Sequence, residues 1–207
     1  MNVGLSFNLK KPPEEPSAND LYAEWDDEET IAAVRSALSL RHRVIPIEAN
    51  EEAFEKFRAF RPDIVFNMAE GLYGPSRESQ VPAMLEMLRI PYTGSDPLTL
   101  GLCLDKSLAK EVLSYHRIPT APFGVVHALK KNQEFPPLPL IVKPLAEGSS
   151  KGIGNSALVR TPKQLREQIL AVLTQYRQPA LVEKYLPGRE FTVAVLGNGP
   201  GVKVLPI

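Results

Sequence analysis

The segment VKPLAEGSSKGIG, residues 142–154, combines residue types that are suited to binding an anion. An apolar run leads into Lys143, and a second lysine, Lys151, lies in a loop with glycines and two serines. We expect Gly148 and Gly152 to let the backbone approach a ligand closely and to adopt positive φ. Successive backbone amides form anion-binding concavities, and the two lysines supply countercharge. This segment therefore predicts a phosphate-binding loop at the end of a buried strand.

Two other phosphate-binding patterns, GxxxxGK[ST] and GxGxxG, occur nowhere in the sequence. The alternative interpretation of residues 142–154 is an ordinary hairpin whose glycine-rich turn carries solvated lysines. A second motif downstream, LVEKYLPGREFTV at residues 181–193, favours the phosphate site over that alternative.

The first hundred residues alternate short apolar runs with helical patterns. We expect strands at residues 2–7, 44–47 and 63–67, with a strand and turn at 90–95. We also expect three helices. The first begins at the caps Asp26 and Asp27, the second carries Phe54, Phe57 and Phe60 on one face, and the third comprises residues 81–88. This alternation predicts a parallel, doubly wound sheet. Ligands of such sheets bind at the carboxyl ends of strands, where the polar loop 67–71 lies.

The second part of the chain has a different pattern. Helices are expected at residues 106–115 and from Thr161-Pro162, where a capping residue precedes proline. The latter helix directs Leu165, Ile169, Val172 and Leu173 inward. Strands are expected at residues 123–127, 140–143, 180–183 and 191–196.

Composition excludes several classes of function. The chain has 24 Lys plus Arg and 24 Asp plus Glu, so it has no net field to hold a nucleic acid or an anionic membrane. No apolar run approaches the roughly 20 residues of a membrane span. The one cysteine, Cys103, cannot form an internal disulfide, which indicates a reducing, cytoplasmic setting. We expect Cys103 to be a small core residue rather than a nucleophile.

Five ordered motifs resemble the ATP-grasp superfamily and, within it, the D-alanine–D-alanine ligase-like proteins. The five are the helix VPAMLEML itself and, after it, IPYTGS, DKSLAK, LIVKPLAEGSSKGIG and LVEKYLPGREFTVAVLG. The resemblance covers residues 63–198, and residues 1–62 share only the βα rhythm. It implies an α/β fold: a pre-ATP-grasp Rossmann-like domain at 1–103, a central ATP-grasp lobe at 104–187 and the start of a second, incomplete lobe at 188–207.

The resemblance also implies roles for individual residues. Lys106 and Lys143 would contact the nucleotide phosphates, and Ser149 would hydrogen-bond near the reacting carboxylate, so Ser149 and Lys143 are the catalytic candidates. Glu190 would bind the ribose hydroxyls. The loop that folds over the phosphates would comprise Glu147, Gly148, Ser149, Ser150, Lys151 and Gly152. The linker that receives adenine would comprise Glu183, Lys184, Tyr185 and Leu186.

The chain departs from the family pattern in two places. The amino-terminal substrate loop is replaced by residues 10–27, where Glu24 is the nearest glutamate before the first helix. Glu24 is a candidate for holding a substrate ammonium, and the alternative is a surface glutamate near a helix cap. The second departure is the end at Ile207. We expect the family's magnesium ligands to lie beyond it, and the 207-residue chain alone to bind ATP weakly and to lack activity.

These expectations converge on an ATP-dependent carboxylate–amine ligase that uses ATP and Mg²⁺ and forms an amide through an acylphosphate. The partners would be an amino acid or another small carboxylate, with no nucleic acid or membrane, and a homodimer is left open. The alternative is a non-catalytic nucleotide-binding or interaction module derived from a ligase. We also expect residues 146–154 to be poorly ordered without nucleotide, because glycines and small polar side chains make few apolar contacts.

Overall fold

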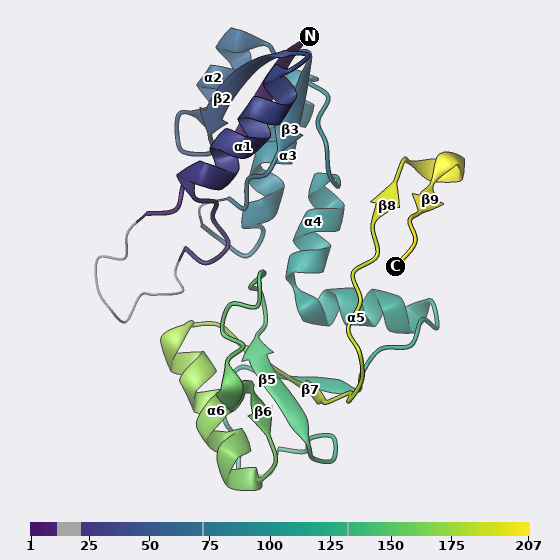
Figure 1. Ribbon diagram of the computed structural model, residues 1–207. Coiled ribbons are helices and arrows are strands. Elements are labelled where there is room, and N and C mark those ends of the chain that lie inside the picture. Colours follow the sequence, from purple (N-terminus) through teal and green to yellow (C-terminus); the bar gives the residue numbers. More distant parts are fainter. Residues whose placement is uncertain (12–21, 72, 132) are drawn as a thin grey trace.

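The computed structural model describes residues 1–11, 22–71, 73–131 and 133–207. Its strands form three sheets, with strand orders β2-β1-β3, β4-β7-β5-β6 and β8-β9 (Figure 1). The first two sheets have separate hydrophobic cores. The fold is therefore mixed α/β, with one parallel and two antiparallel sheets. The domain boundaries inferred from the sequence remain predictions.

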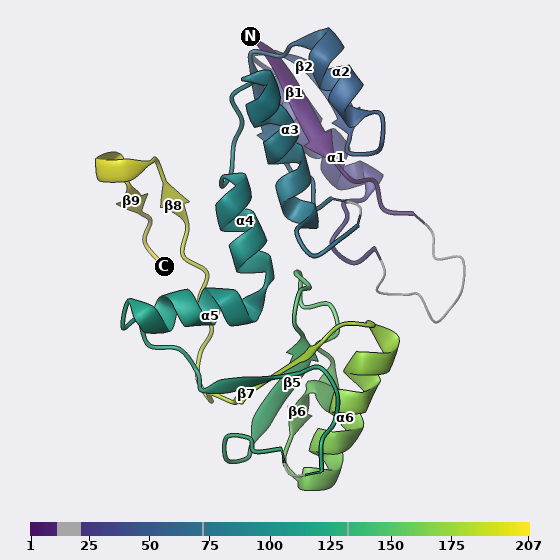
Figure 2. The same ribbon diagram turned by 180° about the vertical axis from the view of Figure 1, so that it is seen from behind.

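The first sheet consists of three parallel strands: β1 (Asn2–Phe7), β2 (Arg43–Glu48) and β3 (Ile64–Asn67). Helix α1 (Glu28–Ser39) covers one face, and α2 (Ala53–Phe60) and α3 (Gln80–Leu88) cover the other (Figures 1 and 2). The core on the α2 and α3 side is built around Phe57, Val65 and Leu85, which are fully buried. The parallel sheet with helices on both faces is confirmed.

Local signals set the helix ends in this part of the chain. Asp27 caps α1, because its carboxylate accepts a hydrogen bond from the Thr30 amide at 2.8 Å. The three phenylalanines expected on one face of α2 lie within about 120° of the helix circumference, but they differ in burial. Phe57 is buried, Phe54 is half-buried and Phe60 is 52% exposed, because positions three apart rotate by about 60° per step around a helix.

Residues 90–95 form less regular structure than expected. Only a single parallel bridge joins Val65 and Tyr92, so this stretch adds no further strand to the first sheet. The next residues form helix α4 (Pro97–Leu104), which Asp96 caps. Cys103 is exposed on this helix, so its expected burial in a core is wrong.

The second sheet is antiparallel and is covered on one face by a helix. Its strands are β4 (Phe123–Val126), β5 (Leu140–Pro144), β6 (Leu158–Val159) and β7 (Ala180–Lys184). Helix α5 (Lys106–Tyr115) precedes the sheet, and α6 (Pro162–Gln175) packs against it. Thr161 and Gln164 form a capping box at the start of α6, and the expected inward stripe of α6 is confirmed.

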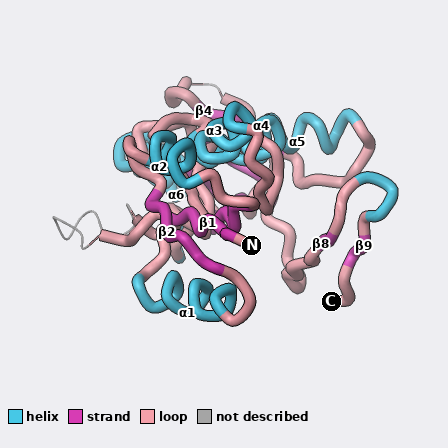
Figure 3. Tube along the Cα trace, turned by 90° about the horizontal axis from the view of Figure 1, so that it is seen from above, coloured by secondary structure: helices cyan, strands magenta, loops and turns pink. Residues whose placement is uncertain are grey.

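The last part of the chain is a small hairpin of β8 (Val195–Leu196) and β9 (Lys203–Val204). It projects away from both larger sheets (Figures 1 and 3). The strand expected at 191–196 is therefore reduced to two residues, because residues 186–207 are exposed and pair with neither larger sheet. Among the described residues, no helix has the length and hydropathy that crossing a bilayer requires.

Candidate functional site

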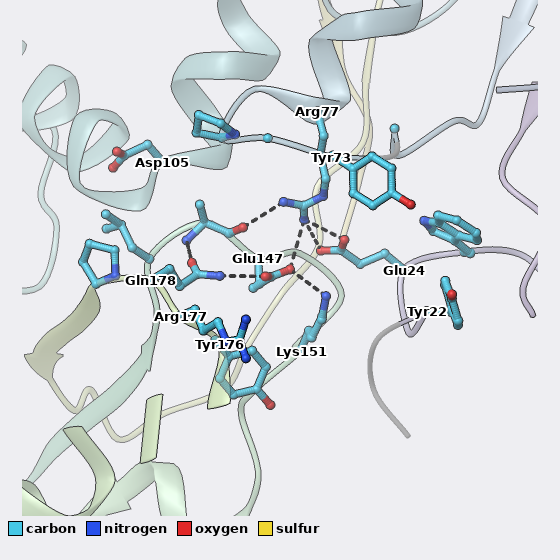
Figure 4. Close-up of a pocket in the computed structure, with 17 residues that line it drawn as sticks. Tyr22, Glu24, Tyr73, Arg77, Asp105, Glu147, Lys151, Tyr176, Arg177 and Gln178 are labelled. Atoms are coloured by element: carbon cyan, nitrogen blue, oxygen red, sulfur yellow. Dashed lines mark hydrogen bonds and ion pairs between the residues drawn. The ribbon is translucent and has the colours of Figure 1, made fainter. Parts of the chain in front are cut away.

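The glycine-rich loop follows β5 and contacts the first part of the chain. Figure 4 shows such a contact, between Arg77 and the loop backbone at Ala146. Two lysines flank its base. Lys143 lies on β5, and Lys106 is the first residue of α5. The Lys106 ammonium donates to the carbonyl oxygen of Leu145 at 3.3 Å and to that of Glu147. Lys106 therefore holds the base of the loop through its backbone.

The electrostatics at the base of the loop suit an anion. Burial lowers the pKa of Lys106 from its ordinary value, and the nearby positive charge of Lys143 lowers it further. Two ammonium groups that repel each other in a half-buried position favour binding of a polyanion, which relieves the repulsion. The structure thus brings together the two lysines that the sequence assigned to phosphate.

Glu183 on β7 lies between two lysines on the sheet face opposite α6. Its carboxylate pairs with Lys143 at 2.5 Å and with Lys110 at 2.9 Å. Burial alone would raise the pKa of Glu183, but hydrogen bonds and charge from these two lysines outweigh burial and lower it. Glu183 therefore stays ionised and presents a carboxylate acceptor beside Lys143.

Lys110 is a site residue that the sequence analysis did not single out. Its ammonium also donates to the Thr120 hydroxyl at 2.6 Å and lies over the Phe123 ring, 5.3 Å from the centroid. The sequence carried a signal for it, because Lys110 follows Lys106 by one helical turn within DKSLAK.

The loop turns sharply through three left-handed positions within four residues. Ser149, Ser150 and Gly152 have φ values of 45°, 59° and 76°. The expected positive φ is confirmed for Gly152. It is wrong for Gly148, whose backbone is not in the left-handed region. At Gly148 the feature is instead a close approach, because a Cβ there would lie 2.9 Å from Glu24 Oε1. The loop backbone thus approaches a glutamate of the first part of the chain closely.

Arg77 joins the first part of the chain to the glycine-rich loop (Figure 4). Its Nη2 donates to Glu24 Oε1 at 2.8 Å and Oε2 at 2.6 Å, and lies 3.1 Å from Glu147 Oε2. Its Nη1 donates to the carbonyl oxygen of Ala146 at 3.0 Å. The sequence analysis missed Arg77, because nothing in the local pattern indicates that this arginine meets residues some 70 positions away.

Glu24 is 8% exposed, so its interpretation as a surface glutamate is wrong. Besides pairing with Arg77, it accepts a hydrogen bond from the Gly148 amide. Its role towards a substrate ammonium remains a prediction.

Two further side chains complete the polar support of the loop. Gln178 accepts from the Ala146 amide at 2.7 Å and donates to Glu147 Oε1 at 2.7 Å. Lys151 pairs with Glu147 Oε2 at 3.0 Å. The expected disorder of residues 146–154 rested on the lack of apolar contacts, and the structure supplies polar contacts in their place. Order in solution remains to be measured.

A cavity of about 560 Å³ lies beside this network. Tyr22, Trp25, Tyr73 and Tyr176 contribute aromatic surface to it, and Glu24, Arg77, Glu147 and Lys151 contribute charge. The cavity therefore opens onto the same loop that the lysines support.

A second acidic group, Glu70, lies in the loop after β3. The side-chain oxygen of Asn8, which is 1% exposed, accepts from the Glu70 amide at 3.0 Å and from the Gly71 amide at 2.9 Å, which fixes this loop. Burial and the charges of Glu78 and Glu24 raise the pKa of Glu70 to about 7. Burial also raises the pKa of Glu78.

The remaining predicted nucleotide contacts lie on the segment that leaves β7. The Lys184 ammonium donates to the carbonyl oxygens of Pro137 and Leu138 at 2.9 and 3.1 Å, and the Tyr185 amide donates to Pro139 at 3.2 Å. Leu186 and Glu190 are exposed, and so are Ser149 and Ser150. Their roles stay predictions. Within the described residues, no group of three or more His, Cys, Asp or Glu is arranged to hold a metal ion.

Comparison with known proteins agrees with this architecture. The family model described as "D-ala D-ala ligase C-terminus" matches residues 113–207. Among solved structures, D-alanine–D-alanine ligase from Helicobacter pylori has a TM-score of 0.68 at 17% identity, covering 99% of this chain and 73% of that one. The enzyme from Bacillus anthracis, also solved in complex with ATP, has TM-scores of 0.62 and 0.60 at 24% and 22% identity, with coverages of 99% and 100% of this chain and 68% and 70% of those chains. These likenesses establish that the chain shares the fold of these ligases.

Comparison of the amino-acid sequence with curated relatives defines the family more narrowly than the fold does. The D-alanine–D-alanine ligase of Moorella thermoacetica is 36% identical over 187 residues, which are 85% of this chain and 58% of the relative. An uncharacterised protein of Sinorhizobium fredii is 43% identical over 144 residues, 70% of this chain and 42% of the relative. The chain is thus a D-alanine–D-alanine ligase-like protein. It spans about half the length of the curated relatives it matches.

Proposed function

We propose that the chain supplies the nucleotide-binding part of an ATP-dependent ligase that joins a carboxylate to an amine. The observation that supports this most strongly is the pair of lysines under the glycine-rich loop. Lys106 and Lys143 come from a helix and a strand that are distant in sequence, and burial together with the charge of Lys143 lowers the pKa of Lys106. A site of this kind gains most from a bound polyphosphate.

The residues present fit a nucleoside triphosphate. The two ammonium groups and the amides of residues 148–152 would hold the phosphates, because charge-assisted donors suit phosphoryl oxygens. The ionised Glu183 offers an acceptor for an exocyclic amine of the base. Lys184, Tyr185 and Leu186 would line the base, and Glu190 would accept from the ribose hydroxyls. Mg²⁺, which phosphoryl-transfer enzymes use, would neutralise charge on the phosphate oxygens.

The proposed reaction has two steps. A carboxylate oxygen attacks the γ-phosphorus and the bond to the β-phosphate oxygen breaks, which gives an acylphosphate and ADP. An amine nitrogen then attacks the acyl carbon, phosphate leaves, and the nitrogen loses a proton as the amide forms. In this scheme Lys143 and the loop amides stabilise charge on the transferring group, and Ser149 orients the reacting carboxylate. D-alanine is the first substrate to test, because the named relatives are D-alanine–D-alanine ligases.

Titration calorimetry of the chain with ATP tests the nucleotide site. We expect Lys143→Met to weaken binding at least about tenfold, because an ammonium that meets phosphate in a half-buried site is removed. The fold should survive, since Lys110 still neutralises Glu183. Lys163→Met is the matched control, because Lys163 lies on α6, distant in sequence from Lys143, and its side chain is 86% exposed. Equal affinities for the wild type and Lys143→Met would contradict the assignment.

Turnover separates the ligase from its alternative. ADP release with D-alanine and with other amino acids is measured on this chain and on any longer product of the same reading frame. Amino-acid-dependent release supports the ligase. Tight ATP binding without release in every form would instead support a non-catalytic nucleotide-binding module.

A further inference from the structure

Arg77 occupies a fixed position at the border between the first sheet and the glycine-rich loop. It begins the short 3-10 turn η2 (Arg77–Ser79), directly before α3. The Ser79 hydroxyl in this turn donates to the carbonyl oxygen of Pro97 at 2.7 Å, which anchors the turn to α4. The Arg77 side chain is 11% exposed. The backbone therefore delivers a guanidinium into a nearly buried position.

The guanidinium contacts three groups that lie at different places in the sequence. Nη2 is shared between both oxygens of Glu24 and one oxygen of Glu147, and Nη1 reaches the Ala146 carbonyl. The contacts to the two carboxylates come from Nη2 and the contact to Ala146 from Nη1, two nitrogens that diverge in one plane from a single carbon. A guanidinium supplies this fork, and a lysine ammonium, which concentrates its three donors on one atom, does not.

The contacts of Arg77 hold one side of the loop, and Lys106 holds the other. Lys106 takes the carbonyl oxygens of Leu145 and Glu147, while Arg77 takes that of Ala146 between them. Glu24, which Arg77 neutralises, in turn accepts the Gly148 amide. Four consecutive residues of the loop are thus fixed through their backbone by two cations and one carboxylate.

We propose that Arg77 is a positioning residue that holds the glycine-rich loop in the shape that receives phosphate, by bridging Glu24 and Glu147. The loop backbone is then ordered before nucleotide arrives, and the ordering cost is removed from binding. Arg77 raises nucleotide affinity without touching the nucleotide. The inference about affinity rests on the proposed function, whereas the inference about loop order does not.

The bridge also joins two parts of the site that have separate tasks in the proposed reaction. Glu24 is the candidate for the amine side of the substrate, and the loop serves the phosphate side. Because Glu24 is shared between Arg77 and the Gly148 amide, a ligand that draws Glu24 away loosens both contacts at once. Binding of a ligand at Glu24 is therefore coupled to the order of the glycine-rich loop.

Hydrogen exchange of the 207-residue chain tests the clamp. Arg77→Lys loses the planar arrangement of donors but keeps the positive charge. Because the charge is kept, we expect the variant to fold. We expect amides 146–151 to exchange at least about tenfold faster, with the amides of α3 and β3 unchanged. Arg58→Lys is the matched control, because it alters an exposed pair with Glu55, with side chains 64% and 62% exposed. Should Arg77→Lys fail to fold, Glu147→Gln leaves the Arg77–Glu24 pair intact and is expected to loosen the same amides.

ATP titration adds a readout that a purely structural role would not move. We expect Arg77→Lys to bind ATP about tenfold more weakly, and saturating ATP to restore wild-type protection of amides 146–151. Adenosine, which lacks phosphates, should not restore it. Unchanged exchange at the loop, or faster exchange throughout the chain, overturns the proposal. If the wild type does not bind ATP, the proposed function fails, while exchange of the free chain still decides whether Arg77 orders the loop.

Discussion

The glycine-rich loop (residues 145–152) and the C-terminal segment (residues 186–207) make an instructive contrast. Each follows a strand of the second sheet, β5 or β7, and the loop contains two glycines while the C-terminal segment contains four. The loop is supported by Lys106, Arg77, Glu24 and Gln178. The C-terminal segment is exposed along its whole length and exposes apolar side chains such as Phe191, Leu196 and Ile207.

The contrast shows that composition does not decide whether a glycine-containing segment is contacted by side chains from the rest of the chain. Glycines and serines leave the backbone amides and carbonyls accessible, and such groups are stabilised when charged side chains reach them. In the loop those side chains come from two other parts of the chain. In the C-terminal segment the apolar side chains have no counterpart among the described residues against which to bury. Four predictions test this contrast, in order of decreasing expected effect.

Glu24→Ala should cause the largest loss of stability. It leaves the Arg77 guanidinium with one partner fewer and the Gly148 amide without its acceptor. Breaking a buried ion pair on one side costs about 3 kcal/mol. Urea unfolding measures the change, and Glu55→Ala, in an exposed pair with Arg58, is the control, with an expected loss below about 1 kcal/mol. Equal losses for the two variants would show that the buried network adds nothing.

Gly152→Ala and Gly199→Ala compare the same substitution in the two regions. Gly152 has φ of 76°, and an added Cβ would lie 2.5 Å from the Pro144 ring, so we expect a loss of about 2–3 kcal/mol from strain and overlap. Gly199 has φ of 53° and no atom within 4 Å of an added Cβ, so the loss should be about 1 kcal/mol. Thermal unfolding measures both. A larger loss at Gly199 would reverse the contrast.

Glu70→Gln should raise stability at high pH. The pKa of Glu70 is raised from 4.5 to about 7, so the folded state binds its proton more tightly than the unfolded state between these values. Stability therefore falls as the pH rises from about 4.5 to 7, as a charge develops beside Glu78, Glu24 and Asp26, with Arg77 partly compensating. Because Glu70 is only partly buried, solvent screening reduces the expected gain at pH 8 to about 1–2 kcal/mol.

The measurement for Glu70→Gln is urea unfolding at pH 8 and pH 4.5. The gain should disappear at the lower pH, where Glu70 is largely protonated in the folded state and the two side chains are both neutral. A gain of equal size at both pH values would show that the effect is not the charge of Glu70.

Leu196→Ser should have the smallest effect. Leu196 is 56% exposed on β8, and exposed substitutions away from special features change stability by less than about 0.5 kcal/mol. Thermal unfolding of the chain measures this change, with Leu140→Ala in the second core as the contrasting variant, for which about 3 kcal/mol is expected. A loss at Leu196 comparable to that at Leu140 would mean that the hairpin is buried in solution.

Much of the fold could be predicted from periodicity and end signals. The alternation of apolar runs and helices anticipated β1, β2 and β3, and the Thr161-Pro162 signal anticipated α6. These features are local, since they depend on residues within one or two turns of each other. Predictions failed where exposure depended on the rest of the chain. Phe60, Cys103 and residues 191–194 all have apolar or strand-like character and lie exposed at the surface.

From residue types and spacing, the sequence by itself predicted a phosphate-binding loop beside Lys143, and the family resemblance added Lys106 to that prediction. Only the tertiary structure decided how these groups are held. Lys110 reaches Glu183 across a strand, and Arg77 reaches Glu147 from 70 positions away. Such pairs form because the sheets bring distant backbone segments within the few ångströms over which hydrogen bonds and ion pairs act, and no local pattern encodes that distance.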